Sequence, residues 1–155
     1  MKSITPTTQS AAMSILIVED EPADVTLLKL AFRDCGVTAS LSFATNGEQA
    51  LADLRSSESP HDLLLLDLSL PRKNGKEVLK EIRADAALRN LPVAMFTSSL
   101  ASQDVADCYR LGANCYIGKP NSYPELLLTV RQLTEFWLQV VRLPPKTTPH
   151  PGASD

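Results

Sequence analysis

Charged and hydroxyl side chains follow short apolar segments at four places in this sequence. Glu19 and Asp20 close the first segment, Asp67 closes a run of four leucines, and Thr97 and Lys119 close two later segments. An unpaired buried charge is costly, so a carboxylate directly after a buried leucine run needs a compensating partner. Three carboxylates brought together repel one another and raise some of their pKa values, and a divalent cation would remove that repulsion.

The chemistry that these residue types support is phosphoryl transfer. Hard carboxylate oxygens suit Mg²⁺, which keeps several waters and binds substrate oxygens. A metal ion, the Lys119 ammonium and the Thr97 hydroxyl could together neutralise the equatorial oxygens of a phosphoryl group. A carboxylate at the same place could act as the nucleophile and form an acyl phosphate. The fold must bring these residues together for any of this to happen.

The segments between the site residues have an alternating pattern. Apolar, β-rich runs alternate with segments whose apolar residues recur at helical spacing. We expect strands at residues 14–20, 37–44, 62–67, 91–99 and 114–120. We expect helices at residues 21–36, 45–57, 74–85, 102–113 and 123–143.

This alternation is typical of an α/β fold with a doubly wound parallel sheet. The leucine run at 63–66 is unbroken, as expected of a strand covered by helices on both faces. We therefore predict a single domain with a five-stranded parallel sheet and five helices. Reactive groups in such sheets lie outside the carboxyl ends of the strands, which would gather the acids, the hydroxyl and the amine at one edge.

Four motifs in this order resemble the receiver domain of two-component response regulators. They are VEDEP, LLLLDLSLPRKNG, FTSS and YIGKP, and the similarity extends over about residues 14 to 140. The resemblance implies a flavodoxin-like strand order, 2-1-3-4-5, and transfer of a phosphoryl group from a sensor histidine kinase to Asp67. The loop after Asp67 and the long last helix most resemble small single-domain regulators that serve bacterial phytochrome kinases.

The same resemblance implies a metal site. Glu19, Asp20 and Asp67 would hold Mg²⁺, with Glu19 acting through water, and the backbone carbonyl of Ser69 would complete the metal shell. The chain would be a signalling protein and not an enzyme with an external substrate. Self-phosphorylation and self-dephosphorylation at Asp67 would depend on the metal.

The resemblance also implies a set of contacts around the phosphoryl group. Thr97 and Lys119 would contact its oxygens, and Tyr116 would reorient together with Thr97 on activation. The Lys119–Pro120 peptide bond would be cis, a form that is rare and usually kept for a specific geometry.

Each of these residues alone has an ordinary structural explanation. Asp67 could end a strand at a turn, Glu19 and Asp20 could favour a helix N-terminus through the dipole, and Thr97 could satisfy a backbone group. Tyr116 could be a plain core aromatic residue. The occurrence of all of them at successive strand ends favours the site.

Other functions remain as alternatives. One is a small-molecule phosphatase or phosphotransferase with an aspartyl-phosphate intermediate, and others are a phosphate sink or a scaffold that never takes phosphate. Enzymes of the first kind usually have a second Asp two residues after the nucleophile, where this chain has Ser69. A flavin-binding protein is disfavoured because the acidic segment at 19–24 would repel phosphate. The complete set of site residues argues against the scaffold.

Two further chemistries fit poorly. His61 precedes the leucine run and should lie at the opposite edge from Asp67, and His150 is near the C-terminus, so neither suits a Ser-His-Asp triad there. The segment RKNGKE lacks the first glycine and the Ser/Thr of a phosphate loop, and no G-x-G-x-x-G follows the first expected strand.

Composition bounds the partners and the compartment. The net charge is −3 and there is no basic block, which argues against nucleic-acid binding. The sequence contains no run of about 18 apolar residues, so we expect no membrane span. Three cysteines, Cys35, Cys108 and Cys115, are too few and too widely spaced for a disulfide framework. We therefore expect reduced thiols and a cytoplasmic location.

The two ends of the chain differ in composition from the middle. We expect a disordered leader at 1–13, a receiver domain at 14–143 and a disordered tail at 144–155, with Met13 as a possible alternative start. The tail is rich in Pro, Thr and Ser, and the leader has no apolar core of a signal peptide.

Two interaction surfaces are predicted. The last expected helix has more apolar residues than one core-facing stripe needs, so we expect it to project past the sheet and form a homodimer. Leu126, Val130, Leu133 and Trp137 would form the core stripe. The kinase would dock on the first expected helix, where Ala23, Asp24 and Leu27 should face outward, and on the segment 120–125.

Overall fold

The computed structural model describes residues 13–56 and 60–145 of the chain. Strands and helices alternate as predicted. The strands are β1 (Met13–Val18), β2 (Ala39–Ala44), β3 (Leu63–Leu66), β4 (Val93–Thr97) and β5 (Cys115–Gly118). The helices are α1 (Pro22–Asp34), α2 (Gly47–Ser56), α3 (Gly75–Ala84), α4 (Ser102–Arg110) and α5 (Tyr123–Thr134), which continues into a π-helical segment, η1 (Glu135–Val140).

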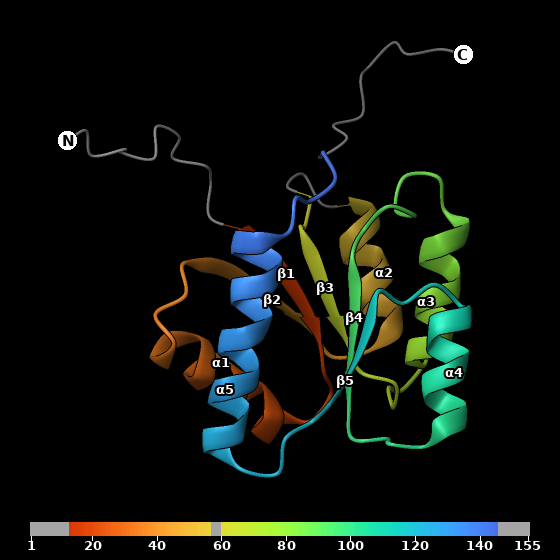
Figure 1. Cartoon of the computed structure of the whole chain (residues 1–155). Helices are drawn as coiled ribbons and strands as arrows, with labels where there is room; N and C mark the ends of the chain where they lie inside the picture. Colours follow the sequence, from red (N-terminus) through yellow and green to blue (C-terminus); the bar gives the residue numbers. More distant parts are fainter. Residues whose placement is uncertain (1–12, 57–59, 146–155) are drawn as a thin grey trace, which may run out of the picture.

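The five strands form one parallel sheet in the order β2-β1-β3-β4-β5. Helices α1 and α5 cover one face, and α2, α3 and α4 lie on the other (Figure 1). The predicted architecture, including the strand order, is confirmed. All carboxyl ends of the strands therefore point to one edge of the sheet, and β1, β3 and β4 meet there as neighbours.

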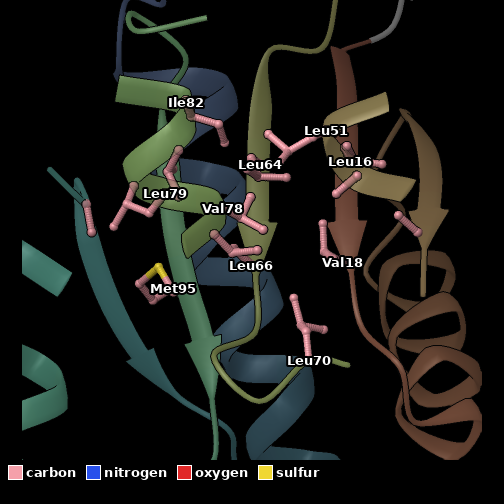
Figure 2. Close-up of a cluster of buried hydrophobic side chains, with 14 of the residues drawn as sticks. Leu16, Val18, Leu51, Leu64, Leu66, Leu70, Val78, Leu79, Ile82 and Met95 are labelled. Carbon is pink, nitrogen blue, oxygen red and sulfur yellow. The ribbon is translucent and has the colours of Figure 1, made fainter. Parts of the chain in front are cut away.

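The four leucines of β3 explain how the centre of the sheet is held. Each is at most 1 % exposed. Leu64 and Leu66 pack toward α2 and α3, in the cluster that Figure 2 shows with Val78 and Ile82. Leu63 and Leu65 pack on the opposite face with residues of α1 and α5. Both faces of β3 are covered by apolar side chains, and Asp67 is the first residue after the strand. Its carboxylate therefore lies at the carboxyl end of β3.

Side-chain caps define where three of the helices begin. Asn46 accepts a hydrogen bond from the backbone N–H of Gln49 at 2.8 Å at the start of α2. Asn74 forms a capping box with Glu77 at the start of α3. Ser122 accepts from the Glu125 N–H and begins α5. Such caps satisfy backbone donors that have no partner within the helix.

The last helix differs from the prediction in its second half. The expected core stripe, Leu126, Val130, Leu133 and Trp137, is buried as predicted. The α-helix nevertheless ends at Thr134, and a π-helical segment follows. The Thr134 hydroxyl donates to the carbonyls of Val130 and Arg131. Bonding of this kind to the preceding turn competes with the helical ladder and bends helices.

The expectation that the helix projects past the sheet is therefore only partly right. The chain becomes extended at Val141. Four of the additional apolar residues pack partly on the molecule's own core, namely Leu127, Leu138, Val141 and Leu143. Three others stay exposed: Leu128, Phe136 and Val140. The exposed surface is smaller than the sequence suggested, because four of these seven residues pack partly on the core.

His61 lies at the amino end of β3, opposite the acidic edge, as predicted. Its Nδ1 is 2.8 Å from the Ser14 hydroxyl, and its Nε2 is 2.8 Å from Asp53. The chain thus has a Ser-His-Asp contact that the sequence did not suggest, but the ring is reversed, since in the hydrolytic triad Nε2 faces the serine. This contact ties α2 to β1 and β3.

The expected leader and tail fall mostly outside the described residues, which begin with β1 at Met13 and end at Pro145. Within residues 13–56 and 60–145, no helix is both long and apolar enough to cross a membrane.

Candidate functional site

Three carboxylates meet at the carboxyl ends of β1 and β3. Ligand oxygens of Glu19, Asp20 and Asp67 all lie within 4.8 Å of one another. Hydrogen bonds beyond the strands hold them there, since the Asp67 N–H donates to Val18 O at 3.2 Å and the Glu19 N–H donates to Ala44 O at 2.9 Å. These bonds extend the pairing of the strands by one residue beyond β1 and β3. The backbone of Glu19 and Asp67 is therefore held by the sheet.

The cluster combines buried and exposed acids. Glu19 and Asp67 are 2 % and 5 % exposed, while Asp20 is exposed to solvent. Burial raises the pKa of Glu19 above the ordinary range, and the Asp67 charge adds to that effect, although hydrogen bonds from Lys119 and the Glu21 N–H oppose it. A divalent cation would relieve the repulsion between these closely spaced carboxylates. Mg²⁺ and Mn²⁺ both prefer hard oxygen ligands of this kind.

Lys119 provides the positive charge of the site. Its Nζ lies 2.5 Å from Glu19 Oε1 and 2.9 Å from Asp67 Oδ2. Burial works to lower the pKa of Lys119, but hydrogen bonds with Glu19 and Asp67 outweigh it and raise the pKa above its usual value. The Lys119 N–H also donates to Thr97 O at 2.8 Å, which anchors the residue to β4. The ammonium is therefore charged and held at the acidic edge, as predicted.

Asp24 is a fourth carboxylate that the sequence did not assign to the site. Its Oδ2 lies 3.1 Å from Lys119 Nζ. The expectation that Asp24 faces outward is only partly right, because its side chain is 37 % exposed but contacts Lys119. Ala23 and Leu27 are exposed as expected. Asp24 lies in the first turn of α1, directly after Glu19 and Asp20, and this proximity in sequence was the available signal. Lys119 thus bridges three acids from three parts of the chain.

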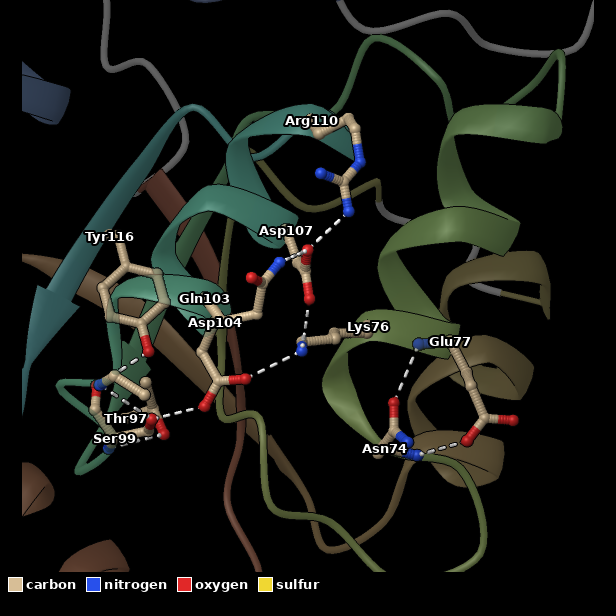
Figure 3. A network of polar contacts seen from close by, with 11 residues as sticks. Asn74, Lys76, Glu77, Thr97, Ser99, Gln103, Asp104, Asp107, Arg110 and Tyr116 are labelled. Atoms are coloured by element: carbon tan, nitrogen blue, oxygen red, sulfur yellow. Dashed lines mark hydrogen bonds and ion pairs between the residues drawn. The ribbon is translucent and has the colours of Figure 1, made fainter.

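The hydroxyls of Thr97 and Tyr116 meet at Ser99. Thr97 is fully buried at the end of β4, and its Oγ1 accepts from the Ser99 N–H at 3.5 Å. The Tyr116 hydroxyl donates to the Ser99 carbonyl at 2.7 Å (Figure 3). Ser99 was not predicted, yet it links the two residues expected to move together. The predicted cis Lys119–Pro120 bond is wrong for this structure, since every described peptide bond is trans, the usual form.

The loop after Asp67 is packed closely against the carboxylate's own backbone. The Ser69 N–H donates to Asp67 Oδ1 at 3.3 Å, and the Gly75 N–H donates to Leu68 O at 2.8 Å. A Cβ on Gly75 would lie 2.3 Å from the Asp67 carbonyl oxygen, far inside contact distance. Only glycine permits this approach. The loop thereby fixes both the carboxylate and Ser69, whose carbonyl was predicted to bind the metal.

With a divalent cation bound, the assembled site could accommodate an oxyanion beside the Asp67 carboxylate. Asp67 is presented on a rigid strand, Lys119 offers a fixed ammonium, and the acidic cluster fits a cation. A divalent cation bound to the acids would act together with the Lys119 ammonium to stabilise the charge that develops on phosphoryl oxygens. The geometry is thus compatible with formation of an acyl phosphate on Asp67.

Comparisons with known proteins agree with this geometry. Response regulator Rcp1 of Synechocystis sp. is 37 % identical over 135 residues, which cover 84 % of this chain and 92 % of that protein. The crystal structure of the phosphorylated cyanobacterial phytochrome response regulator RcpA has a TM-score of 0.82 and 37 % identity, covering 87 % of this chain and 100 % of that one. The Mn²⁺-bound form of Rcp1 has a TM-score of 0.79 and 35 % identity, covering 86 % and 99 %.

The matching region spans the whole sheet. The model of the response regulator receiver domain matches residues 15–131, from β1 into α5. This range includes every residue of the acidic cluster, together with Thr97, Tyr116 and Lys119. The chain belongs to the response regulator receiver family, whose members are signalling proteins.

Proposed function

We propose that Asp67 accepts a phosphoryl group from a sensor histidine kinase and that the resulting change of shape is read by a protein partner. An Asp67 carboxylate oxygen would attack phosphorus, the P–N bond to the kinase histidine would break, and the imidazole nitrogen would leave and take up a proton. The observation that supports this is the contact between Lys119 Nζ and Asp67 Oδ2 inside a cluster of acids.

The proposed cofactor is Mg²⁺. Glu19, Asp20 and Asp67 are the residues that would hold it, with the Ser69 carbonyl as a fourth ligand. The bound cation would supply charge neutralisation for the phosphoryl oxygens. Lys119 and Thr97 would bind the remaining oxygens, and the buried position of Thr97 would exclude water from that side.

Phosphorylation with a small donor tests the assignment directly. Labelled acetyl phosphate should transfer its phosphoryl group to the wild type in the presence of Mg²⁺, and EDTA should abolish the transfer. Asp67→Asn should take up no label. Asp85→Asn, at the far end of α3, is the matched control and should behave as the wild type. Label retained by Asp67→Asn, or uptake that ignores EDTA, would refute the proposal.

The kinase surface that we propose lies beside Lys119. Exposed Leu27 of α1 adjoins a hollow lined by Phe96, Pro120, Tyr123 and Leu126. An apolar hollow next to the acceptor carboxylate suits the docking of a kinase helix. One similar structure is that of a cyanobacterial phytochrome response regulator, so the kinase could be a phytochrome. Leu27→Glu should slow transfer from a phosphorylated kinase and leave transfer from acetyl phosphate unchanged. Asp24 is unsuitable for this test because it contacts Lys119.

We further propose that the chain forms a homodimer in the cytoplasm. Exposed Phe136 stacks edge to face on Trp137 at 5.4 Å, beside a groove between β5 and the last helix that Cys115 and Ile117 also line. A second copy related by twofold symmetry, the commonest arrangement, would cover this apolar surface. The cytoplasmic assignment rests on the three free cysteines, which suit a reducing compartment.

A further inference from the structure

An ion triad connects α3 to α4 on the side of the site away from Lys119. Lys76 Nζ lies 2.8 Å from Asp104 Oδ1 and 2.9 Å from Asp107 Oδ2 (Figure 3). Its two acids come from successive turns of α4, so one ammonium holds the first half of that helix. Asp107 also accepts from Gln103 and pairs with Arg110.

The charges of the triad favour their ionised forms. Hydrogen bonds with Asp104 and Asp107 raise the pKa of Lys76, and the Lys76 hydrogen bond in turn lowers the pKa of Asp107 to about 2. The pKa of Asp104 is lowered as well, first by Lys76 and then by Ser99. All three groups are charged near neutral pH, so the ion pairs do not depend on pH in that range.

One arm of the triad reaches the residues that line the site. Asp104 Oδ2 accepts from the Ser99 hydroxyl at 2.5 Å. Ser99 is also where the Thr97 and Tyr116 hydroxyls meet. The path from Lys76 to Thr97 therefore consists of consecutive polar contacts through Asp104 and Ser99. The longest and weakest step is the 3.5 Å contact between the Ser99 N–H and Thr97 Oγ1.

The other arm reaches Asp67 through the backbone. Lys76 directly follows Gly75, whose Cα lies against the Asp67 carbonyl. Asn74 caps the same turn of α3 through its capping box with Glu77. Lys76 thus joins the loop after Asp67 to the loop between β4 and α4, and these two loops frame one side of the site.

We propose that Lys76 is a positioning residue that, through Asp104, holds Ser99 and Thr97 ready to bind the phosphoryl group. The inference rests on the proposed phosphorylation of Asp67. Loops that are held in place before binding lose less conformational entropy when the phosphoryl group arrives. Loss of the Lys76 charge should therefore weaken binding of a phosphoryl mimic without removing any group that touches it.

Titration with beryllofluoride tests this proposal, because the mimic binds to the aspartate without a kinase. Mg²⁺ is held constant, and the amide NMR resonances of residues 97–101 report saturation. Lys76→Met and Asp104→Asn should each raise the apparent Kd by about two- to thirtyfold, the range typical of substitutions that modulate coupling between sites. Asp107→Asn, which leaves the Ser99 arm intact, should have a smaller effect. Lys76→Arg should restore affinity.

Two controls separate this role from a general loss of stability. Lys80→Met, one turn further along α3 and exposed, should bind as the wild type does. Tyr116→Phe should reduce the effect of Lys76→Met, since both act on Ser99 and their effects should not add. An unchanged or lower Kd in Lys76→Met, or equal effects of Asp104→Asn and Asp107→Asn, would overturn the proposal. Failure of the wild type to bind beryllofluoride would instead refute phosphorylation at Asp67.

Discussion

Lys119 Nζ contacts Asp67 Oδ2 at 2.9 Å and Glu19 Oε1 at 2.5 Å, so two buried acids share one ammonium. A phosphoryl group on Asp67 would share that ammonium with Glu19 and Asp24. The redistribution of a single charge among competing oxygens is then the first local change after phosphorylation. It is also the change that a substitution at Lys119 should remove.

Lys119→Ala should fold but lose its response to phosphoryl mimics. A charge-assisted hydrogen bond contributes about 1.5–3 kcal/mol, so beryllofluoride affinity should fall by about tenfold or more. The same variant should bind Mn²⁺ more tightly than the wild type does, because a cation no longer competes for the acids. Isothermal titration of both ligands measures the two effects, with Lys80→Ala as control. A wild-type response to beryllofluoride would contradict the assigned role.

Glu19→Gln should stabilise the protein in the presence of a chelator while weakening metal binding. The pKa of Glu19 is raised in the folded state, mainly by burial, so the folded chain binds more protons than the unfolded chain. Ionisation of Glu19 therefore costs stability, and this cost grows as pH rises from just above 4.5 through the raised pKa. Functional carboxylates commonly oppose stability in this way.

Denaturant unfolding in EDTA at several pH values measures this effect. The difference in unfolding free energy between Glu19→Gln and the wild type should increase from pH 4.5 upward and then level off. Glu48→Gln, an exposed acid of α2, should show no such trend. A difference that is constant with pH would mean that burial does not disfavour the Glu19 charge.

Gly75→Ala should impair phosphorylation as well as stability. The added methyl group would lie 2.3 Å from the Asp67 carbonyl, so the loop must move away from the nucleophile. Overpacking of this kind typically costs about 1–3 kcal/mol. Gly36→Ala is the comparison, because Gly36 has a φ of +68° with open space around it. Both variants should unfold more easily, but only Gly75→Ala should take up label from acetyl phosphate more slowly.

The double variant Phe136→Glu, Val140→Glu should be monomeric. Both side chains are exposed, at 51 % and 71 %, so the acids would not disturb the core but would repel across a twofold interface. Sedimentation of the wild type and the variant, each with and without phosphorylation, gives the oligomeric state. Leu27→Glu places an acid on a different face and should leave the dimer intact. A wild type that stays monomeric at micromolar concentration in both states would exclude the interface.

Much of the fold and the site could be predicted because their signals are local. The leucine run 63–66 can be buried only between two layers of helices, and the positions of Glu19, Asp67, Thr97 and Lys119 at strand ends follow from the parallel sheet. The alternation of apolar runs and helical spacing was enough to place every strand.

The remaining features depend on contacts between distant segments. Asp24 follows Glu19 and Asp20 closely in the sequence, but the contact of its carboxylate with Lys119, which is 95 residues away, depends on the tertiary fold. The Lys76 triad likewise needs the packing of α3 beside α4. The π-helical end of the last helix reflects a balance between the Thr134 side chain and the backbone ladder, and spacing alone does not reveal which prevails. These three features depend on tertiary contacts, which the spacing of apolar residues in the sequence does not reveal.

Helix α4 is attached to the rest of the molecule by few apolar side chains. Cys108 is its one buried residue, and the ion triad with Lys76 makes up much of the remaining attachment. Elements with little buried apolar surface open locally at a lower free energy than the core around them. The amide protons of α4 should consequently exchange with solvent before those of β3. The outer surface formed by α4 should therefore open locally while the central sheet stays folded.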